Sequence, residues 1–180
     1  MKYQVIYADP PWNYGDKMAG HSFSLDHEYP TMTDDALIAM GGGIKEISDK
    51  DCALFLWATS PNLPIALKVI EAWGFKYVTV AFCWSKRTSG GKEVANLGRW
   101  TMGNVEVCLL AKRGKPQRLV KNIRQLVVAE RTRHSAKPEE VRKRIEALMG
   151  SVPRIELFAR ERKEGWDAFG NEVKSDIALG

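Results

Sequence analysis

The chain opens on a short apolar run that ends abruptly in a proline-rich turn. Val5-Ile6-Tyr7-Ala8 is followed at once by Asp9-Pro10-Pro11-Trp12. A continuous apolar run bounded by a turn is typical of a strand that is buried on both faces, as in a parallel sheet. Prolines cannot continue a central strand, because they have no backbone N–H to donate. The sequence therefore predicts a buried parallel strand whose carboxyl end is held in a rigid turn.

This turn is rich in hydrogen-bond acceptors and poor in donors. The Asp9 carboxylate and the carbonyl groups of Pro10 and Pro11 all accept hydrogen bonds. An exocyclic amino group donates two hydrogen bonds and needs such a lining. Trp12 adds a flat face on which a planar base or amide can stack. The alternative is an ordinary polar turn, with Trp12 packed in the core.

Strand-like and helix-like segments alternate along the rest of the chain. Strands are expected at residues 3–8, 53–59, 75–84, 105–111, 127–129 and 155–159, the last of these being the final strand. Helices are expected at 34–40, with Thr33 as N-cap, at 65–73, with Gly74 as the stop, and after Pro138. Gly41-Gly42-Gly43 is expected to end the first helix. The alternation predicts an α/β fold with a mainly parallel sheet.

Composition narrows the class of protein further. The 180 residues are 44% hydrophobic, which suits the core of one domain. No apolar run reaches the roughly 18 residues of a membrane span, and no signal pattern is seen, so a cytoplasmic protein without membrane contact is expected. Cys52, Cys83 and Cys108 stand singly in apolar runs, which indicates core thiols in a reducing compartment. No histidine or cysteine has metal-ligand spacing, so no metal is expected.

A basic balance points to a polyanionic partner. The net charge is +5 and the isoelectric point is near 9.1. Residues 85–104 form a long polar segment that carries Lys86, Arg87, Lys92 and Arg99, with two glycines in its middle. These charges can meet phosphates, and the glycines allow the loop to close over a target. The alternative is a solvated loop. Further basic clusters, at residues 113–121 and 131–134, extend the same hypothesis or are ordinary surface.

Taken together, these motifs give the chain a recognisable likeness. It resembles the adenine N-6 methyltransferases with an Asp-Pro-Pro-Trp (DPPW) turn, which are relatives of the eukaryotic messenger-RNA adenine methyltransferase and include compact bacterial and phage DNA enzymes. The resemblance covers nearly the whole chain. Beyond Asp9 to Trp12 it includes Tyr29 to Asp35, Gly103 to Leu109, Lys137 to Glu140, Ile155 to Arg160 and Gly165 to Glu172. The order and spacing of these blocks make it specific.

The resemblance implies a fold and a permuted order of motifs. The fold is a Rossmann-like, S-adenosylmethionine-dependent methyltransferase fold, with a mainly parallel sheet and helices on both faces, as a single methyltransferase domain over residues 1–180. In the common arrangement of such folds the cofactor half comes first. Here the catalytic turn is at residue 9, so the elements that bind the cofactor are expected downstream.

The implied reaction is methyl transfer from S-adenosyl-L-methionine to the exocyclic N-6 amine of adenine. The implied catalytic residues are Asp9, Pro10, Pro11 and Trp12. Asp9, helped by the Pro10 carbonyl, accepts from the amine and stabilises the positive charge that grows on its nitrogen. Trp12 stacks on an adenine that is flipped out or already single-stranded.

The resemblance also implies a cofactor site, which is formed by Asp9, Arg160, Asn171 and Glu172. An arginine suits a carboxylate, and an amide or carboxylate suits ribose hydroxyls. The alternatives are a solvated arginine and a plain turn. The chain departs from eukaryotic members at two places. Asn104-Val105 stands where they have a lysine before the block beginning at Glu106, and Arg162-Lys163 stands where they have His-Asn.

The expected partner is nucleic acid, with DNA favoured over RNA because the architecture is compact and has no appended RNA module. Substrate contacts are expected from Trp12, Tyr29, Lys86, Arg87, Lys92 and Arg99. Two alternatives stay open: an RNA adenine methyltransferase, and a non-catalytic nucleic-acid-binding subunit of a methyltransferase pair. Such subunits usually have a degenerate catalytic turn, and this turn is intact. The oligomeric state is left open, a homodimer included.

Overall fold

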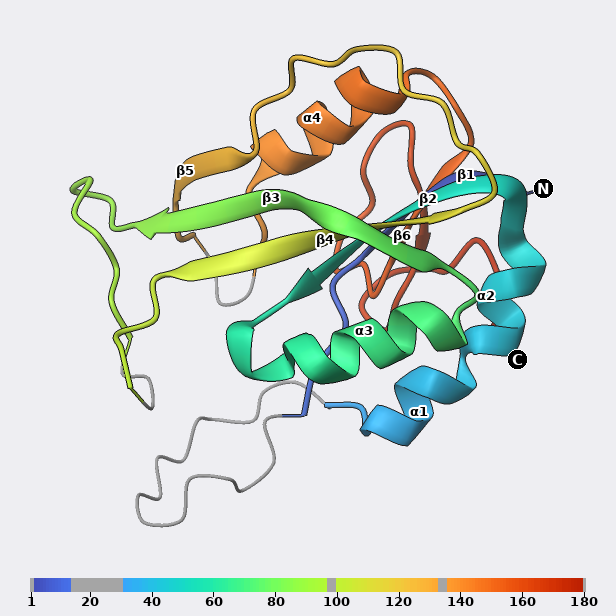
Figure 1. Ribbon diagram of the computed structural model, residues 1–180, viewed down its shortest axis with the longest axis horizontal. Coiled ribbons are helices and arrows are strands. Elements are labelled where there is room, and N and C mark those ends of the chain that lie inside the picture. The colour runs from blue at the N-terminus through green and yellow to red at the C-terminus, as the bar shows by residue number, and fades with distance from the viewer. Residues whose placement is uncertain (1, 14–30, 97–99, 133–135, 180) are drawn as a thin grey trace.

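The computed structural model describes residues 2–13, 31–96, 100–132 and 136–179. These residues form one seven-stranded sheet with the strand order β5-β3-β4-β2-β1-β6-β7. The strands are β1 (Tyr3–Ala8), β2 (Ser48–Ala58), β3 (Lys76–Arg87), β4 (Val105–Arg113), β5 (Leu126–Glu130), β6 (Arg154–Leu157) and β7 (Asp167–Phe169). The helices are α1 (Asp34–Ala39), α2 (Gly41–Ile47), α3 (Leu63–Ala72) and α4 (Glu139–Met149), with a short 3-10 turn, η1, at Ser60–Asn62. Figure 1 shows the sheet with its helices.

The sheet is mainly parallel, as expected, with one reversed strand. β1 pairs in parallel with β2 and β6, β3 with β5, and β6 with β7. β4 is antiparallel to both of its neighbours, β2 and β3. The amino end of β4 therefore lies at the same edge of the sheet as the carboxyl ends of β1, β2 and β3. The predicted catalytic turn after β1 also lies at this edge, which is called the catalytic edge below for that reason.

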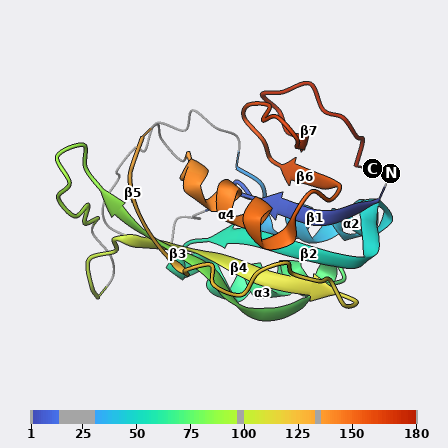
Figure 2. The ribbon, with the colours of Figure 1, turned by 90° about the horizontal axis from the view of Figure 1, so that it is seen from above.

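Helices cover both faces of the sheet, which confirms the expected layering. Viewed from above, α4 lies on one side of the strands and α3 on the other (Figure 2). Alternate residues of β1 pack on opposite faces of the sheet. Ile6 lies in the core that includes α1 to α3, and Val5 lies in the core that includes α4. Both are fully buried, as the continuous apolar run predicted. None of the helices among the described residues is long and apolar enough to span a membrane.

Several boundary predictions were wrong. β2 begins at Ser48 and not at residue 53, and β3 runs to Arg87, so Lys86 and Arg87 lie in a strand and not in the loop expected at residues 85–104. The first helix does end before Gly41, as expected, but Gly41-Gly42-Gly43 is not an exit from it, because these glycines begin α2. A Cβ on Gly41 would lie 2.4 Å from the Ala72 carbonyl oxygen, so this glycine lets α2 approach the end of α3 closely. The strand at residues 155–159 was expected to be the last, but β7 follows it as an edge strand. Thr33, by contrast, caps α1 as predicted: its side chain accepts from the Ala36 N–H at 3.2 Å.

Candidate active site

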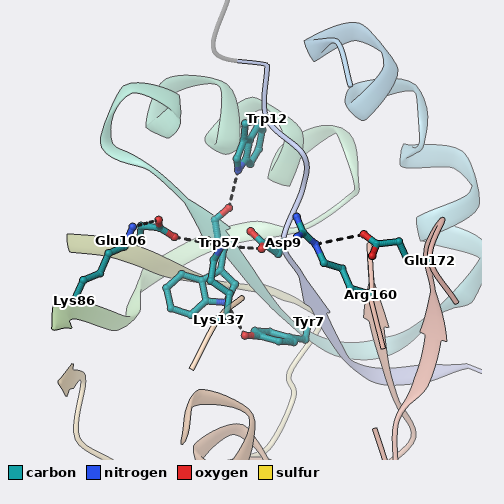
Figure 3. Close-up of polar contacts among 9 residues, drawn as sticks. All are labelled: Tyr7, Asp9, Trp12, Trp57, Lys86, Glu106, Lys137, Arg160 and Glu172. Carbon is teal, nitrogen blue, oxygen red and sulfur yellow. Dashed lines mark hydrogen bonds and ion pairs between the residues drawn. The ribbon is translucent and has the colours of Figure 1, made fainter. Parts of the chain in front are cut away.

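Four charged side chains from distant parts of the chain meet at the catalytic edge (Figure 3). Asp9 follows β1, Glu106 lies near the start of β4, Lys137 precedes α4 and Arg160 follows β6. The parallel pairing of β1 with β6 aligns Ala8 with Leu157, and so brings the residues that follow both strands together. The reversed direction of β4 brings in Glu106. The fold thus assembles a site around the predicted turn.

Lys137 is the centre of the ion-pair network. Its Nζ donates to Asp9 Oδ2 at 2.7 Å and lies 3.3 Å from Glu106 Oε2. Lys86 Nζ also pairs with Glu106. The side chains of Lys137 and Glu106 are only 10% and 15% exposed, whereas that of Asp9 is 25% exposed. Asp9 is therefore held by a buried cation while part of its side chain stays open to a ligand.

Burial and neighbouring charges set the protonation of this network. Burial raises the pKa of Asp9 above its ordinary value, and the charge and hydrogen bond of Lys137 oppose this without cancelling it. Burial alone would raise the pKa of Glu106, but Lys137 and Lys86 together hold it lower than usual. The two carboxylates raise the pKa of Lys137 despite its burial. Lys137 and Glu106 are therefore both charged at neutral pH, and Asp9 is a more basic acceptor than an ordinary aspartate.

The turn itself is tied down by backbone hydrogen bonds. The Trp12 N–H donates to the Pro10 carbonyl at 2.8 Å, and the Met32 N–H donates to the Pro11 carbonyl at 2.9 Å. A carbonyl oxygen has two lone pairs, so that of Pro10 can still accept from a substrate. Because the chain before and after this turn is held, Asp9 projects from a fixed backbone.

Trp12 is packed in the core. It is 4% exposed, belongs to the core on the α1–α3 face, and donates its indole N–H to the Trp57 carbonyl at 3.0 Å. The packing alternative is thus what the structure shows. Stacking of Trp12 on adenine stays a prediction, and it requires an exposed ring face that this conformation does not provide.

Aromatic rings line the site behind the charges. The Lys137 ammonium lies 5.5 Å from the centre of the Trp57 ring, and that of Lys86 lies 5.2 Å from the Trp84 ring. The two indoles meet edge to face, with centres 6.4 Å apart. The sequence patterns assigned no role to either tryptophan or to Lys137 and Glu106. Lys137 and Glu106 do stand inside the blocks that carry the resemblance, and that position was the signal that could have found them.

The residues carried over for the cofactor gather on the side of β6 and β7. Arg160 Nε lies 3.7 Å from Glu172 Oε1, and the positive charge of Arg160 is close enough to lower the pKa of Asp9. Figure 3 places Arg160 between Asp9 and Glu172. Asn171 is exposed beside Glu172. The structure therefore brings Arg160, Glu172 and Asp9 into one neighbourhood, with Asn171 at its exposed margin.

Arg162 and Lys163, where the chain departs from eukaryotic members, both form polar contacts within the protein. Arg162, which stands where they have histidine, donates to Asp176 Oδ1 at 2.9 Å and to the Lys174 carbonyl at 2.8 Å. Lys163 pairs with Glu161 at 2.8 Å. Arg162 thus ties down the C-terminal segment.

The residues predicted to contact substrate have mixed outcomes. Lys86 lies at the catalytic edge, but it pairs with Glu106 and so belongs to the ion network. Arg87 pairs with Glu93 at 2.6 Å, and Lys92 is exposed. Tyr29 and Arg99 lie outside the described residues.

The two further basic clusters lie in different places. Arg113 ends β4 and therefore lies at the edge opposite the catalytic one, where β2 and β3 begin. Arg131 follows β5 and donates its backbone N–H to the Arg87 carbonyl at 2.9 Å. Of these two clusters, the second therefore begins on the catalytic edge and the first does not.

Comparison with known proteins gives a consistent result. The MT-A70 family model matches residues 3–172. The type II methyltransferase M.MunI of Mycoplasma sp is 38% identical over 190 aligned residues, which cover 96% of this chain and 78% of that protein. The N(6)-adenosine-methyltransferase catalytic subunit METTL3 of Homo sapiens is 30% identical over 178 residues, covering 96% of this chain but 28% of METTL3. The MT-A70-like protein of Drosophila melanogaster is also 30% identical, with 27% of it covered.

Proposed function

Because this chain belongs to the MT-A70 family, we propose that it is an adenine-specific DNA methyltransferase that transfers a methyl group to the N-6 amine of adenine. The observation that carries the proposal is the Asp9 carboxylate, which a buried lysine holds at the catalytic edge while 25% of its side chain stays exposed. A carboxylate so placed accepts from an amino group and stabilises the charge that develops on it.

S-adenosyl-L-methionine is the proposed methyl donor; when bound, it supplies an activated methyl on a sulfonium. The residues present fit it. Arg160 suits its carboxylate, and Glu172 and Asn171 suit its ribose hydroxyls. A Cβ on Gly170 would lie 2.1 Å from the Ala159 carbonyl oxygen, so a glycine is what allows the segments that carry Arg160 and Asn171 to approach each other.

The chain's own groups divide the work of the reaction. Asp9 and the Pro10 carbonyl accept the two hydrogen bonds of the adenine amine and so aim its nitrogen. As positive charge grows on that nitrogen, the ionised Asp9 stabilises it, and the raised pKa of Asp9 strengthens the acceptor. During or after the transfer, the methylated amine loses one proton to the Asp9 carboxylate, which returns it to solvent. Lys137 keeps Asp9 ionised and in place through its 2.7 Å hydrogen bond.

DNA is the proposed polymer. The type II methyltransferase of Mycoplasma sp matches this chain over 78% of its length, whereas the chain spans only about a quarter of the eukaryotic N(6)-adenosine methyltransferases. Similarity at 30% identity to those enzymes keeps RNA as the second candidate. A DNA substrate, together with three unpaired cysteines, supports a cytoplasmic location.

Methyl transfer to two polymers side by side tests the proposal. The protein is incubated with S-adenosylmethionine carrying a labelled methyl group and with adenine-containing DNA or RNA. The product nucleosides are then identified by mass spectrometry. We expect labelled N6-methyldeoxyadenosine from DNA. Label in RNA alone would contradict the choice of polymer, and label in neither would favour a non-catalytic subunit.

A further inference from the structure

One tryptophan, Trp57, is linked to the predicted catalytic turn directly through Trp12 and indirectly through Lys137. Its backbone carbonyl accepts the Trp12 indole N–H at 3.0 Å. Its ring lies 5.5 Å from the Lys137 ammonium, which in turn holds Asp9 at 2.7 Å. The attraction of a cation to an aromatic ring depends on the cation lying over the ring face. The orientation of the Trp57 ring therefore bears on where Lys137 can sit, and so on Asp9.

Tyr7 accepts the hydrogen bond that the Trp57 ring donates. The Trp57 indole N–H donates to the Tyr7 hydroxyl at 2.7 Å, and both side chains are 1% exposed (Figure 3). A buried N–H without an acceptor costs free energy, so the ring takes the orientation that reaches the hydroxyl. Tyr7 lies in β1, two residues before Asp9. Because side chains alternate along a strand, that of Tyr7 lies on the face of the sheet that α4 covers. Burial raises the pKa of Tyr7 well above its ordinary value, so its hydroxyl stays neutral.

We infer that Tyr7 is a positioning residue of the catalytic site: its hydroxyl orients the Trp57 ring, and the oriented ring holds the Lys137 ammonium against the Asp9 carboxylate. The inference rests on the proposed function only in that catalysis by Asp9 is what the positioning serves. Tyr7 touches no reacting atom. Its contribution passes through Trp57 and Lys137.

The charges around Asp9 determine how its pKa would change if the Tyr7 hydroxyl were removed. Lys137 and Arg160 face Asp9 as cations, from the segment before α4 and from the end of β6. Among the residues that the structure describes, Glu106 from β4, Glu156 from β6 and the Cys108 thiol from β4 are also coupled to it. A released Trp57 ring leaves all of these in the protein but loosens Lys137. Since Lys137 lowers the pKa of Asp9, that pKa must rise.

Strand β1 supplies a matched pair of variants. Tyr7→Phe deletes the hydroxyl that accepts from Trp57 and keeps the ring. Tyr3→Phe deletes a hydroxyl that donates to Asp167 Oδ2 at 2.6 Å, from a ring that is only 3% exposed. We expect about fivefold lower turnover in Tyr7→Phe, as for the removal of one neutral hydrogen bond, with the acidic limb of the pH–rate profile shifted to higher pH. Tyr3→Phe should leave both unchanged.

The decisive readout does not need activity. Carboxyl 13C NMR of aspartate-labelled protein, with the Asp9 signal assigned from Asp9→Asn, follows the titration of Asp9 directly. We expect its pKa to rise in Tyr7→Phe and to stay at the wild-type value in Tyr3→Phe. If Tyr7→Phe does not fold, Trp57→Phe carries the same test, because phenylalanine keeps a ring face for Lys137 but has no N–H.

A double-mutant cycle then tests the route. If Tyr7 acts through the Trp57 N–H, adding Tyr7→Phe to Trp57→Phe changes the Asp9 titration no further. An unchanged pKa in Tyr7→Phe, equal shifts in both tyrosine variants, or additive shifts in the cycle would each overturn the inference. The two proposals can fail separately. If the wild-type protein methylates neither polymer, but the Asp9 pKa rises in Tyr7→Phe and not in Tyr3→Phe, the proposed function is refuted and the positioning of Asp9 by Tyr7 stands.

Discussion

At the scale of single residues, Lys137 decides how Asp9 titrates. Burial raises the pKa of Asp9 and Lys137 opposes that rise. The working form is the carboxylate, so the methylation rate should fall as the pH drops through this raised pKa, at a pH above the usual range of an aspartate. Lys137→Met removes the opposing charge and should move the acidic limb to still higher pH. A pH–rate profile measures both, and Lys68→Met on the exposed face of α3 is the control.

An acidic limb that stays in place in Lys137→Met would mean that another group controls the rate. The contact between Lys137 and Asp9 spans 128 residues of sequence, and such a distance explains why the sequence did not predict it. Asp9 to Trp12 could be predicted because their chemistry is contiguous. Local patterns gave Glu106 and Lys137 no roles, because each acts through partners that only the folded sheet brings near; their place inside the blocks that carry the resemblance was the one available signal.

A second prediction at this scale concerns the cofactor. Arg160→Ala and Asn171→Ala should each weaken binding of S-adenosylmethionine by about 1–3 kcal/mol, since each leaves a polar group of the ligand without a partner. Isothermal titration calorimetry measures this without any substrate. Arg162→Ala is the matched control, because that arginine is half-exposed and is engaged with Asp176. Wild-type affinity in both test variants would move the cofactor site elsewhere.

At the scale of elements, the triple glycine gives a sharp test of helix packing. Gly41→Ala would place a Cβ 2.4 Å from the Ala72 carbonyl oxygen, whereas nothing lies within 4 Å of a Cβ on Gly42. We expect Gly41→Ala to lower the free energy of unfolding by about 1–3 kcal/mol. Gly42→Ala should leave it unchanged or raise it by up to about 1 kcal/mol, because alanine favours helix. Urea denaturation compares the two, and equal stabilities would contradict the close approach of α2 and α3.

The elements also show what a sequence pattern can and cannot predict. The strand over Tyr3–Ala8 and the cap at Thr33 follow from local chemistry and were predicted. The glycines at 41–43 do follow the end of α1, but they begin α2 although glycine is a poor helix former; at Gly41 the close approach of the Ala72 carbonyl requires a residue without a side chain. The direction of β4 is set by its neighbours and not by its own residues. β7, with three residues, is too short to show a period.

At the scale of the whole molecule, the basic residues of the catalytic edge should contact the DNA backbone. Replacing Arg87 and Lys92 together by alanine should weaken DNA binding and reduce the slope of log affinity against log salt by about two units, roughly one for each phosphate that is no longer neutralised. Fluorescence anisotropy with a short duplex over a range of salt concentrations measures the slope. Affinity for S-adenosylmethionine should not change.

The opposite edge supplies the control for this experiment. Lys112 lies in β4 beside the start of β3, and Lys115 follows β4, far along the strands from the catalytic turn. Replacing both by alanine removes the same charge and should leave the salt slope unchanged. Equal slopes in the two double variants would contradict a DNA-binding face at the catalytic edge.

The most direct test of the central claim, that the Asp9 carboxylate carries out adenine methylation, is single-turnover methyl transfer by Asp9→Asn. The substitution keeps the size of the side chain and removes its charge, and Lys137 retains Glu106 as a partner. N6-methyldeoxyadenosine formed on a DNA oligonucleotide is quantified by mass spectrometry with enzyme in excess. We expect the rate to fall at least ~100-fold, with binding of S-adenosylmethionine within a few-fold of wild type. Methylation at close to the wild-type rate would contradict the account.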